Sequence, residues 1–311
     1  MTELLLHWEG KLTPIKMFYE DRIHSIANMT LIEQVRETLD SGDPIVRKWT
    51  LIESNYLPFL LSFMYVIFVK TVGPFLMKNR KPFDLRKVMI LYNFLLVITY
   101  FVCVAGLFYV FFTTDAISKV CYPAEVKRNH YTYFAASAGW IIYLLKYIEF
   151  ADTVFFVLRK KDHLITNLHV IHHAALPIIG WFLFRSEKSG FQFVPGVTNS
   201  IVHIVMYTYY GLAAIGPEVQ KYLWWKEHLT KFQMLQFIVI IFFVLVLLPL
   251  SGCKATKNGI YIDIFFALVF LALFWNFYMK TYGKSPRKKN AINGFSNSIA
   301  INSTTKPLKV E

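Results

Sequence analysis

Residues 168–173 read Leu-His-Val-Ile-His-His, and they begin an apolar run that continues to residue 184. In a helix, side chains at positions i, i+3 and i+4 lie on one face, so His169, His172 and His173 point the same way. The run has about the length that spans a bilayer. Ionisable side chains at membrane depth are costly, and a cluster of them therefore indicates a functional site.

The composition excludes an ordinary soluble domain. Hydrophobic residues make up 55% of the 311 residues, aromatic residues make up 17%, and the mean hydropathy is +0.42. A soluble core of this size cannot bury so much apolar surface. The formal net charge of +13 would suit nucleic acid binding, but the basic residues flank apolar segments, as they do in cytoplasmic loops. We therefore expect a polytopic membrane protein that does not bind nucleic acid.

Seven apolar segments follow a polar N-terminal arm, and each is close to the roughly 20 residues that a spanning helix needs. They lie at about 56–77, 88–112, 131–158, 168–186, 193–216, 232–249 and 260–279. This pattern predicts an all-α membrane protein with seven transmembrane helices. The expected domains are an amphipathic lumenal arm at 1–55, a seven-helix domain at 56–282 and a disordered basic cytosolic tail at 283–311.

Lysine and arginine are unevenly distributed between alternate loops. The loops after the first, third and fifth segments, together with the tail, hold 18 of them, whereas the opposite loops hold 7. The positive-inside rule therefore predicts a cytosolic C-terminus and an N-terminus across the membrane. If that far side is an oxidising lumen, Cys121 and Cys253 lie there, where they either form a disulfide or remain free thiols. The sequon at Asn28 is expected to carry sugar on the same side.

Polar side chains in the third to sixth segments form four clusters. The clusters are Lys146, Glu149, Asp152 and Thr153; His169, His172 and His173; Asn199, His203, Met206, Tyr207 and Tyr210; and Thr230, Gln233 and Gln236. With the predicted orientation, all four lie at the membrane centre or in its cytosolic half. One polar chamber that opens to the cytosol is the simplest interpretation.

At these residues the chain resembles the very-long-chain fatty acid elongase (ELO) family. The similarity runs from about residue 57 to residue 282. It rests on four motifs in order, namely Lys146-x-x-Glu149-x-x-Asp152-Thr153, His169-x-x-His172-His173, His203-x-x-Met206-Tyr207-x-Tyr209-Tyr210 and Thr230-x-x-Gln233-x-x-Gln236. The resemblance implies a 3-oxoacyl-CoA synthase of the endoplasmic reticulum membrane that joins long-chain acyl-CoA with malonyl-CoA to give 3-ketoacyl-CoA, CoA and CO2.

The same resemblance sets expectations for the fold and the partners. Helices two to seven are expected to surround a long acyl-chain tunnel, with the first helix packed outside. No bound cofactor is expected, because acyl-CoA and malonyl-CoA are substrates. Besides membrane lipids, the expected partners are the 3-ketoacyl-CoA reductase, the 3-hydroxyacyl-CoA dehydratase and the enoyl-CoA reductase that act on the product. Whether the chain forms a homodimer is left open.

The implied reaction explains the residue types. Decarboxylation of malonyl-CoA generates the enolate, so no strong base is needed. The enzyme needs either an acyl acceptor or a well-placed thioester, together with hydrogen-bond donors where negative charge develops. No cysteine lies in the expected chamber, so a neutral imidazole is the remaining good nucleophile. We expect His172 to carry the acyl group and His203 to face it. His169, His173 and Asn199 are expected to orient these groups or to donate hydrogen bonds.

A further set of residues is predicted to bind the substrates. The set is Lys146, Glu149, Asp152, Thr153, Arg159, Lys160, Lys161, Tyr207, Tyr210, Gln233 and Gln236. Most members have a simpler alternative. The charged residues of the third segment either serve the site or only neutralise one another, the tyrosines either line the chamber or only pack, and the loop cations either bind coenzyme A phosphates or only set the topology.

Other protein classes also fit part of the pattern. Membrane desaturases and hydroxylases contain His-x-x-His-His, but they hold two irons with about eight histidines. Of the nine histidines here, four are expected at membrane depth, which is too few to bind two metal ions. Four histidines would be enough ligands for a single zinc ion. No metal is predicted. A seven-helix receptor or transporter is disfavoured, because the polar cluster opens to the cytosol and no internal repeat is visible.

Overall fold

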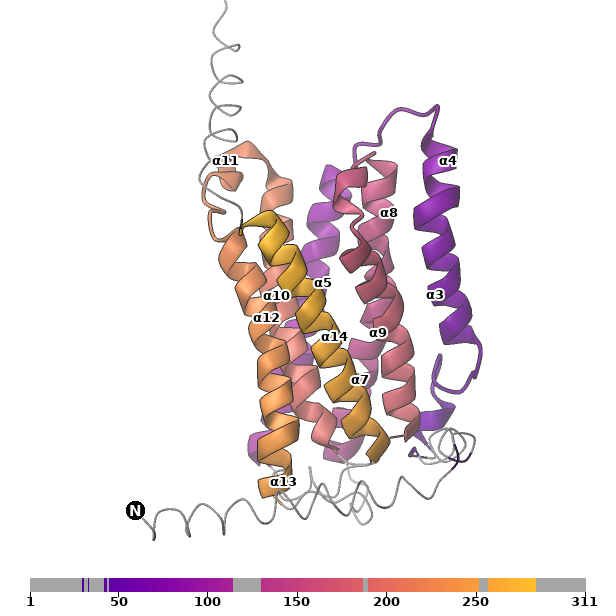
Figure 1. Ribbon diagram of the computed structural model, residues 1–311, viewed down its shortest axis with the longest axis vertical. Coiled ribbons are helices and arrows are strands. Elements are labelled where there is room, and N and C mark those ends of the chain that lie inside the picture. The colour runs from indigo at the N-terminus through magenta and orange to yellow at the C-terminus, as the bar shows by residue number, and fades with distance from the viewer. Residues whose placement is uncertain are drawn as a thin grey trace, which may run out of the picture.

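The computed structural model shows helices only, and no strand occurs in the residues that it describes. These residues are 45–113, 130–186, 190–251 and 257–283, together with Thr30, Glu33, Gly42 and Asp43. The longer helices stand side by side as one upright bundle (Figure 1). Asn28, Cys121, Cys253, the tail and most of the predicted arm lie outside the described residues.

The helices follow the predicted apolar segments. In chain order, the longer ones are α3 (Leu57–Ile67), α5 (Arg86–Thr113), α7 (His130–Ile148), α8 (Phe150–Leu158), α9 (Asn167–Ser186), α10 (Phe193–Ile215), α12 (Lys226–Phe242) and α14 (Lys257–Thr281). The short elements are η1 (Val46–Lys48), η2 (Phe68–Val72), α4 (Gly73–Met77), η3 (Asp162–Leu164), η4 (Gly190–Gln192), α11 (Pro217–Gln220), η5 (Phe243–Leu247) and α13 (Leu248–Leu250).

Within the described residues, five helical stretches are long and apolar enough to cross a membrane. They are Leu57–Met77, Arg86–Thr113, Asn167–Ser186, Lys226–Leu250 and Asn258–Thr281. The chain is therefore a multi-pass membrane protein. The two other predicted spans correspond to α7 with α8 and to α10, which carry much of the predicted polar chamber. That the chain has seven transmembrane helices stays a prediction.

Two of the membrane-length helices contain a π-helical turn that ends two residues before a proline. The turn η2 precedes Pro74, and η5 precedes Pro249. Proline has no N–H, and its ring collides with the preceding turn, so a regular α-helical bond is lost at each position. A π-type turn is one way for a helix to absorb such a change without ending.

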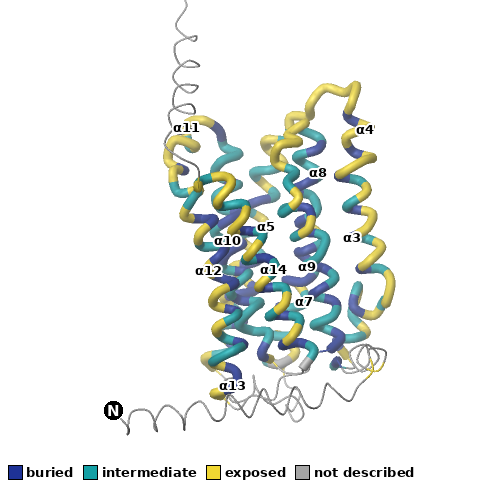
Figure 2. Tube along the Cα trace, viewed as in Figure 1, coloured by how far each residue is buried: buried dark blue, intermediate teal, exposed yellow. Residues whose placement is uncertain are grey.

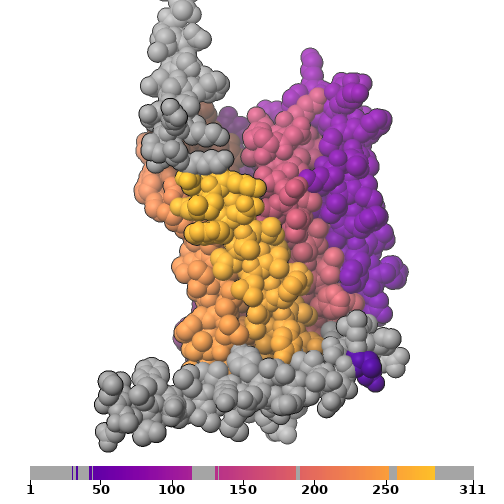
Figure 3. Space-filling view, in the orientation of Figure 1, coloured from indigo at the N-terminus to yellow at the C-terminus, as the bar shows by residue number. Residues whose placement is uncertain are grey.

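Six of the described helices form a closed ring. In this ring α5 packs on α7, α7 on α9, α9 on α14, α14 on α12, α12 on α10, and α10 again on α5. Figure 3 shows α14 between α12 and α9 on one face of the molecule. The first helix lies outside the ring at one edge, where α3 packs on α9 and α4 packs on α8 (Figure 1). An acyl tunnel within the ring stays a prediction.

The outward faces of the bundle are apolar. Figure 2 shows exposed residues along the outer edge of α3 and α4, whereas most of the bundle interior is buried or half-buried. Phe63, Phe75 and Phe101 are 63%, 77% and 61% exposed. A large apolar surface of this kind is unfavourable in water but is solvated by lipid.

Candidate active site

Lys146 lies at the centre of a buried polar network between α5, α7 and α10. Its Nζ lies 2.8 Å from the Tyr100 hydroxyl, 3.3 Å from Glu149 Oε1, 3.0 Å from Asn199 Oδ1 and 3.2 Å from His203 Nε2. An ammonium group has three hydrogens, so four acceptors compete for them. Lys146 is 7% exposed and Glu149 is 0% exposed, so the two charges compensate each other away from water.

Glu149 lies at the junction where α7 ends and α8 begins. The Asp152 N–H donates to the Glu149 carbonyl at 3.1 Å, an i to i+3 bond that tightens the chain at this point. The Ile148 carbonyl accepts a hydrogen bond of 3.2 Å from the Tyr92 hydroxyl of α5. The junction therefore places the Glu149 carboxylate in the interior, and the Tyr92 hydroxyl gives the neighbouring Ile148 carbonyl a hydrogen-bond partner.

The Glu149 carboxylate and His203 have defined hydrogen-bonding roles. Glu149 Oε1 accepts from the Tyr100 hydroxyl and from Lys146, and it lies 3.5 Å from His203 Nε2. His203 Nδ1 lies 2.8 Å from the Asn199 carbonyl. A carbonyl only accepts, so Nδ1 carries a hydrogen, and Nε2 of a neutral His203 is then able to accept from Lys146.

A second chain of polar groups reaches the histidine box from the outer helix. The Tyr65 hydroxyl of α3 lies 2.7 Å from Thr153 Oγ1 on α8, and Thr153 Oγ1 lies 2.9 Å from His169 Nε2 on α9. The Tyr65 ring stacks on Phe150 with its centroid 4.3 Å away, and Thr153 is fully buried. The helix outside the ring therefore contributes a hydroxyl to this part of the site.

The three histidines of the box contact one another and an aromatic surface. The ring centroids of His169 and His173 are 4.3 Å apart, and those of His172 and His173 are 5.7 Å apart. Phe270 and Phe274 of α14 contact the His172 ring with centroid distances of 4.9 and 5.9 Å. Nδ1 of His172 and Nδ1 of His173 are buried without a hydrogen-bond partner among the described residues. Because such groups are costly, a bound polar group would stabilise the box.

Tyr207 joins α10 to the carboxylate of Asp152. Its hydroxyl donates to Asp152 Oδ2 at 2.8 Å, and both residues are buried. Tyr210 contacts Tyr207 and Tyr209 through its ring, with centroid distances of 6.1 and 6.0 Å. Tyr207 is therefore hydrogen-bonded to the predicted site, whereas Tyr210 packs against aromatic rings.

The two glutamines of α12 differ in their contacts. Gln233 Nε2 donates to Met206 Sδ at 3.4 Å. Gln236 is buried, and its Oε1 has no hydrogen-bond partner in the part of the chain that the structure describes. An amide with an unsatisfied oxygen is able to bind a further donor.

The predicted basic residues lie apart from this network. Arg159 Nη1 lies 3.1 Å from Met89 Sδ, and Lys160 Nζ donates to the Lys78 carbonyl at 3.2 Å. Lys161 is exposed. These side chains lie beyond the end of α8, where either predicted role, binding of phosphates or setting of topology, is compatible with their positions.

No arrangement of three or more His, Cys, Asp or Glu side chains suited to a metal ion occurs among the described residues. His203 contacts Lys146 and Glu149. The box histidines contact Thr153 and one another. The absence of a bound metal stays a prediction.

Two tyrosines of the site were missed by sequence analysis. Tyr65 and Tyr100 lie in apolar segments, where an aromatic residue is usually core. The available signal was their hydroxyl group, because a buried phenol normally needs a hydrogen-bond partner. The partners, Thr153 and Glu149, come from a different segment of the chain.

A profile of the family described as ELO: GNS1/SUR4 matches residues 50–290. This range covers most of the chain and all of the network described above. The chain belongs to the ELO family. The four motifs thus predicted the family correctly. The alternative interpretation as a di-iron desaturase receives no support from this match.

Several relatives of this ELO-family chain are similar over most of their length. A very long chain fatty acid elongase of Aedes aegypti is 40% identical over 268 residues, which cover 85% of this chain and 74% of the relative. Very long chain fatty acid elongase 7 of Drosophila melanogaster is 37% identical, with coverage of 84% and 80%. Very long chain fatty acid elongase 4 of Homo sapiens is 36% identical, with coverage of 89% and 87%.

Proposed function

We propose that this chain catalyses the condensing step of fatty acid elongation, in which long-chain acyl-CoA and malonyl-CoA give 3-ketoacyl-CoA, CoA and CO2. Membership of the ELO family and the names of its relatives support elongation. The observation that carries the chemistry is the buried network of Lys146, Glu149, Asn199 and His203. A separate hydrogen bond joins Thr153, one turn from Glu149, to His169 of the histidine box.

In the first proposed step, His172 accepts the acyl group. A ring nitrogen attacks the thioester carbonyl, a C–N bond forms, the C–S bond breaks, and CoA leaves as a thiolate that takes a proton from solvent. The aromatic rings of Phe270 and Phe274 beside His172 support this assignment, because they exclude water from the reactive acyl-imidazole.

In the second proposed step, malonyl-CoA loses CO2. The electron pair of the broken C–C bond forms an enolate, whose carbon two attacks the acyl carbonyl and releases His172. Negative charge develops on the thioester oxygen, and Lys146 and the Asn199 amide are the donors that we assign to it. His169, His173 and His203 are assigned to orientation and to hydrogen bonding with the two thioesters.

The remaining assignments follow from the same reaction. We assign the acyl chain to the interior of the helix ring and coenzyme A to the end that bears Arg159, Lys160 and Lys161. The protein is assigned to the endoplasmic reticulum membrane, with a lumenal N-terminus and a cytosolic C-terminus. The 3-keto product then passes to a reductase, a dehydratase and a second reductase, and no cofactor is held by this chain.

Purified protein tests the proposal when it is incubated with long-chain acyl-CoA and labelled malonyl-CoA. We expect labelled 3-ketoacyl-CoA and CO2 and, without malonyl-CoA, an acyl mass on the peptide that contains His172. His172→Ala should abolish both signals, whereas His163→Ala, at an exposed position in η3, should leave both unchanged.

Three results would change the proposal. Normal turnover of His172→Ala would overturn the role of His172. Condensation without an acyl adduct would favour direct attack within a ternary complex of enzyme and both thioesters. A lack of condensation at every chain length would overturn the function.

A further inference from the structure

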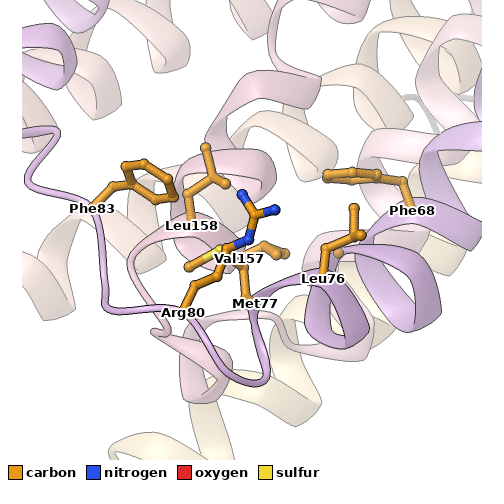
Figure 4. A pocket seen from close by; sticks show the side chains of 8 residues that line it. Phe68, Leu76, Met77, Arg80, Phe83, Val157 and Leu158 are labelled. Atoms are coloured by element: carbon orange, nitrogen blue, oxygen red, sulfur yellow. The ribbon is translucent and has the colours of Figure 1, made fainter.

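A small pocket lies outside the helix ring, where the outer helix meets α8. Its volume is about 130 Å³. It is lined by Phe68, Gly73, Leu76, Met77, Arg80, Phe83, Val157 and Leu158 (Figure 4). None of the predicted site residues belongs to this lining, and Arg80 is the single charged side chain in it. The pocket is therefore distinct from the candidate active site.

Close packing of α4 against α8 forms the wall of the pocket. A Cβ on Gly73 would lie 2.7 Å from Val157 Cγ1 and 2.9 Å from the Phe68 carbonyl oxygen, so the missing side chain permits this approach. The Phe83 N–H donates to the Leu158 carbonyl at 3.0 Å and ties the following loop to the end of α8. Backbone packing and a backbone hydrogen bond thus define the shape of the pocket.

Arg80 brings a positive charge to an apolar surface. Figure 4 shows its guanidinium group among the apolar side chains of the lining. No described residue forms an ion pair or a side-chain hydrogen bond with this group. A guanidinium has five N–H donors in a planar fork that fits phosphate or carboxylate oxygens. The donors of Arg80 are therefore available to an anionic ligand.

The surroundings of the pocket suit a lipid. Leu76 is 50% exposed and Phe75 is 77% exposed, so the apolar lining continues onto the outer face of α4. Further cations lie at the same end of the bundle, where Lys160 contacts the Lys78 carbonyl at 3.2 Å. With a volume of about 130 Å³, the pocket is large enough for a stretch of acyl chain and too small for a whole lipid.

We propose that this pocket binds an anionic phospholipid of the surrounding bilayer. The phosphate group pairs with Arg80, the first part of one acyl chain fills the apolar pocket, and the rest of the lipid follows the outer face of α3 and α4. Positive charge at this end favours a headgroup with net negative charge over a zwitterionic one. The proposal is independent of the condensing reaction.

Lipid retention measured by native mass spectrometry tests the site. The full chain is reconstituted in nanodiscs that contain equal amounts of phosphatidylserine and phosphatidylcholine, and the lipids that stay bound after release are identified. We expect preferential retention of phosphatidylserine by the wild type and about tenfold weaker retention by Arg80→Gln, since one charge-assisted contact is lost. Lys81→Gln removes the same charge from the next residue, which does not line the pocket, and should retain the lipid as the wild type does.

A phosphatidylserine that carries a photoreactive group in its acyl chain gives an independent readout. In the wild type we expect crosslinks to peptides that contain residues 68–83 or 157–158. Equal retention by the wild type and Arg80→Gln, equal retention of the two lipids, or crosslinks confined to other segments would each overturn the proposal. Displacement of phosphatidylserine by an equal concentration of a free fatty acid would overturn the phospholipid assignment.

Discussion

Among single residues, Lys146 and Glu149 are the most informative. Their charged groups lie 3.3 Å apart and are almost inaccessible to solvent. Such a pair is weak evidence for function, because each charge is needed to stabilise the other. The additional contacts of Lys146 with Asn199 and His203 favour a role in the site. Stability and activity must therefore be measured separately.

We predict that Lys146→Met lowers the free energy of unfolding by about 3–5 kcal/mol, because it leaves the Glu149 carboxylate buried without its cation. The double variant Lys146→Met/Glu149→Leu should regain most of this stability, yet it should remain inactive in condensation. Thermal unfolding in detergent and the labelled malonyl-CoA assay measure the two effects.

An exposed ion pair serves as the control. Lys221 and Glu218 are 3.0 Å apart, with side chains that are 56% and 90% exposed. Lys221→Met should cost less than about 1 kcal/mol, because surface pairs contribute little. A double variant at Lys146 and Glu149 that folds and condenses normally would mean that the buried pair is structural only.

Among the elements, α3 has an unexpected connection to the site. It packs outside the ring, as expected for the first helix, but its Tyr65 hydroxyl reaches Thr153 and through it His169. The hydroxyl of Thr153 therefore contacts both Tyr65 on the outer helix and His169 in the histidine box.

We predict that Tyr65→Phe lowers the rate of condensation about two- to tenfold, which corresponds to the roughly 0.5–1.5 kcal/mol of one hydrogen bond. The measurement is kcat and KM with acyl-CoA, together with the unfolding temperature. Tyr56→Phe is the matched control, since Tyr56 lies next to the start of α3 and is 72% exposed. An unchanged kcat for Tyr65→Phe would show that the hydroxyl only contributes to packing.

At the scale of the whole molecule, the orientation in the membrane is the main open prediction. The excess of lysine and arginine in alternate loops predicts a lumenal N-terminus and a cytosolic C-terminus. Two sequons, at Asn28 and Asn302, lie near opposite ends of the chain and outside the described residues. They report on orientation because only a lumenal sequon receives sugar.

We predict that endoglycosidase treatment of protein from microsomes shifts its electrophoretic mobility, and that Asn28→Gln removes this shift. Asn302→Gln should have no effect, because the positive-inside rule places the tail in the cytosol. Both substitutions are conservative and lie near the termini, so each is the control for the other. Sugar on Asn302 would invert the predicted topology.

The fold was largely predictable from local sequence properties. Apolar runs interrupted by basic loops indicated the helices, because hydropathy over about 20 residues measures what a bilayer-spanning helix requires. Their ends agree with the structure within a few residues except at α12, which begins at Lys226 rather than near residue 232. The polar first turns of α12 carry Glu227 and Lys231, and hydropathy gives no helical signal for such residues. A 3.0 Å ion pair between them supports this extension of the helix.

The amino-acid sequence by itself determined the helical class, the membrane character and the common face of His169, His172 and His173, because these depend on composition and on the 3.6-residue period. Only the tertiary structure decided the order of helices in the ring, the contact of Lys146 with His203 and the reach of Tyr65 to Thr153. Those contacts join residues 57 and 88 positions apart in the chain. No local pattern encodes them, because they depend on which helix faces pack together in three dimensions.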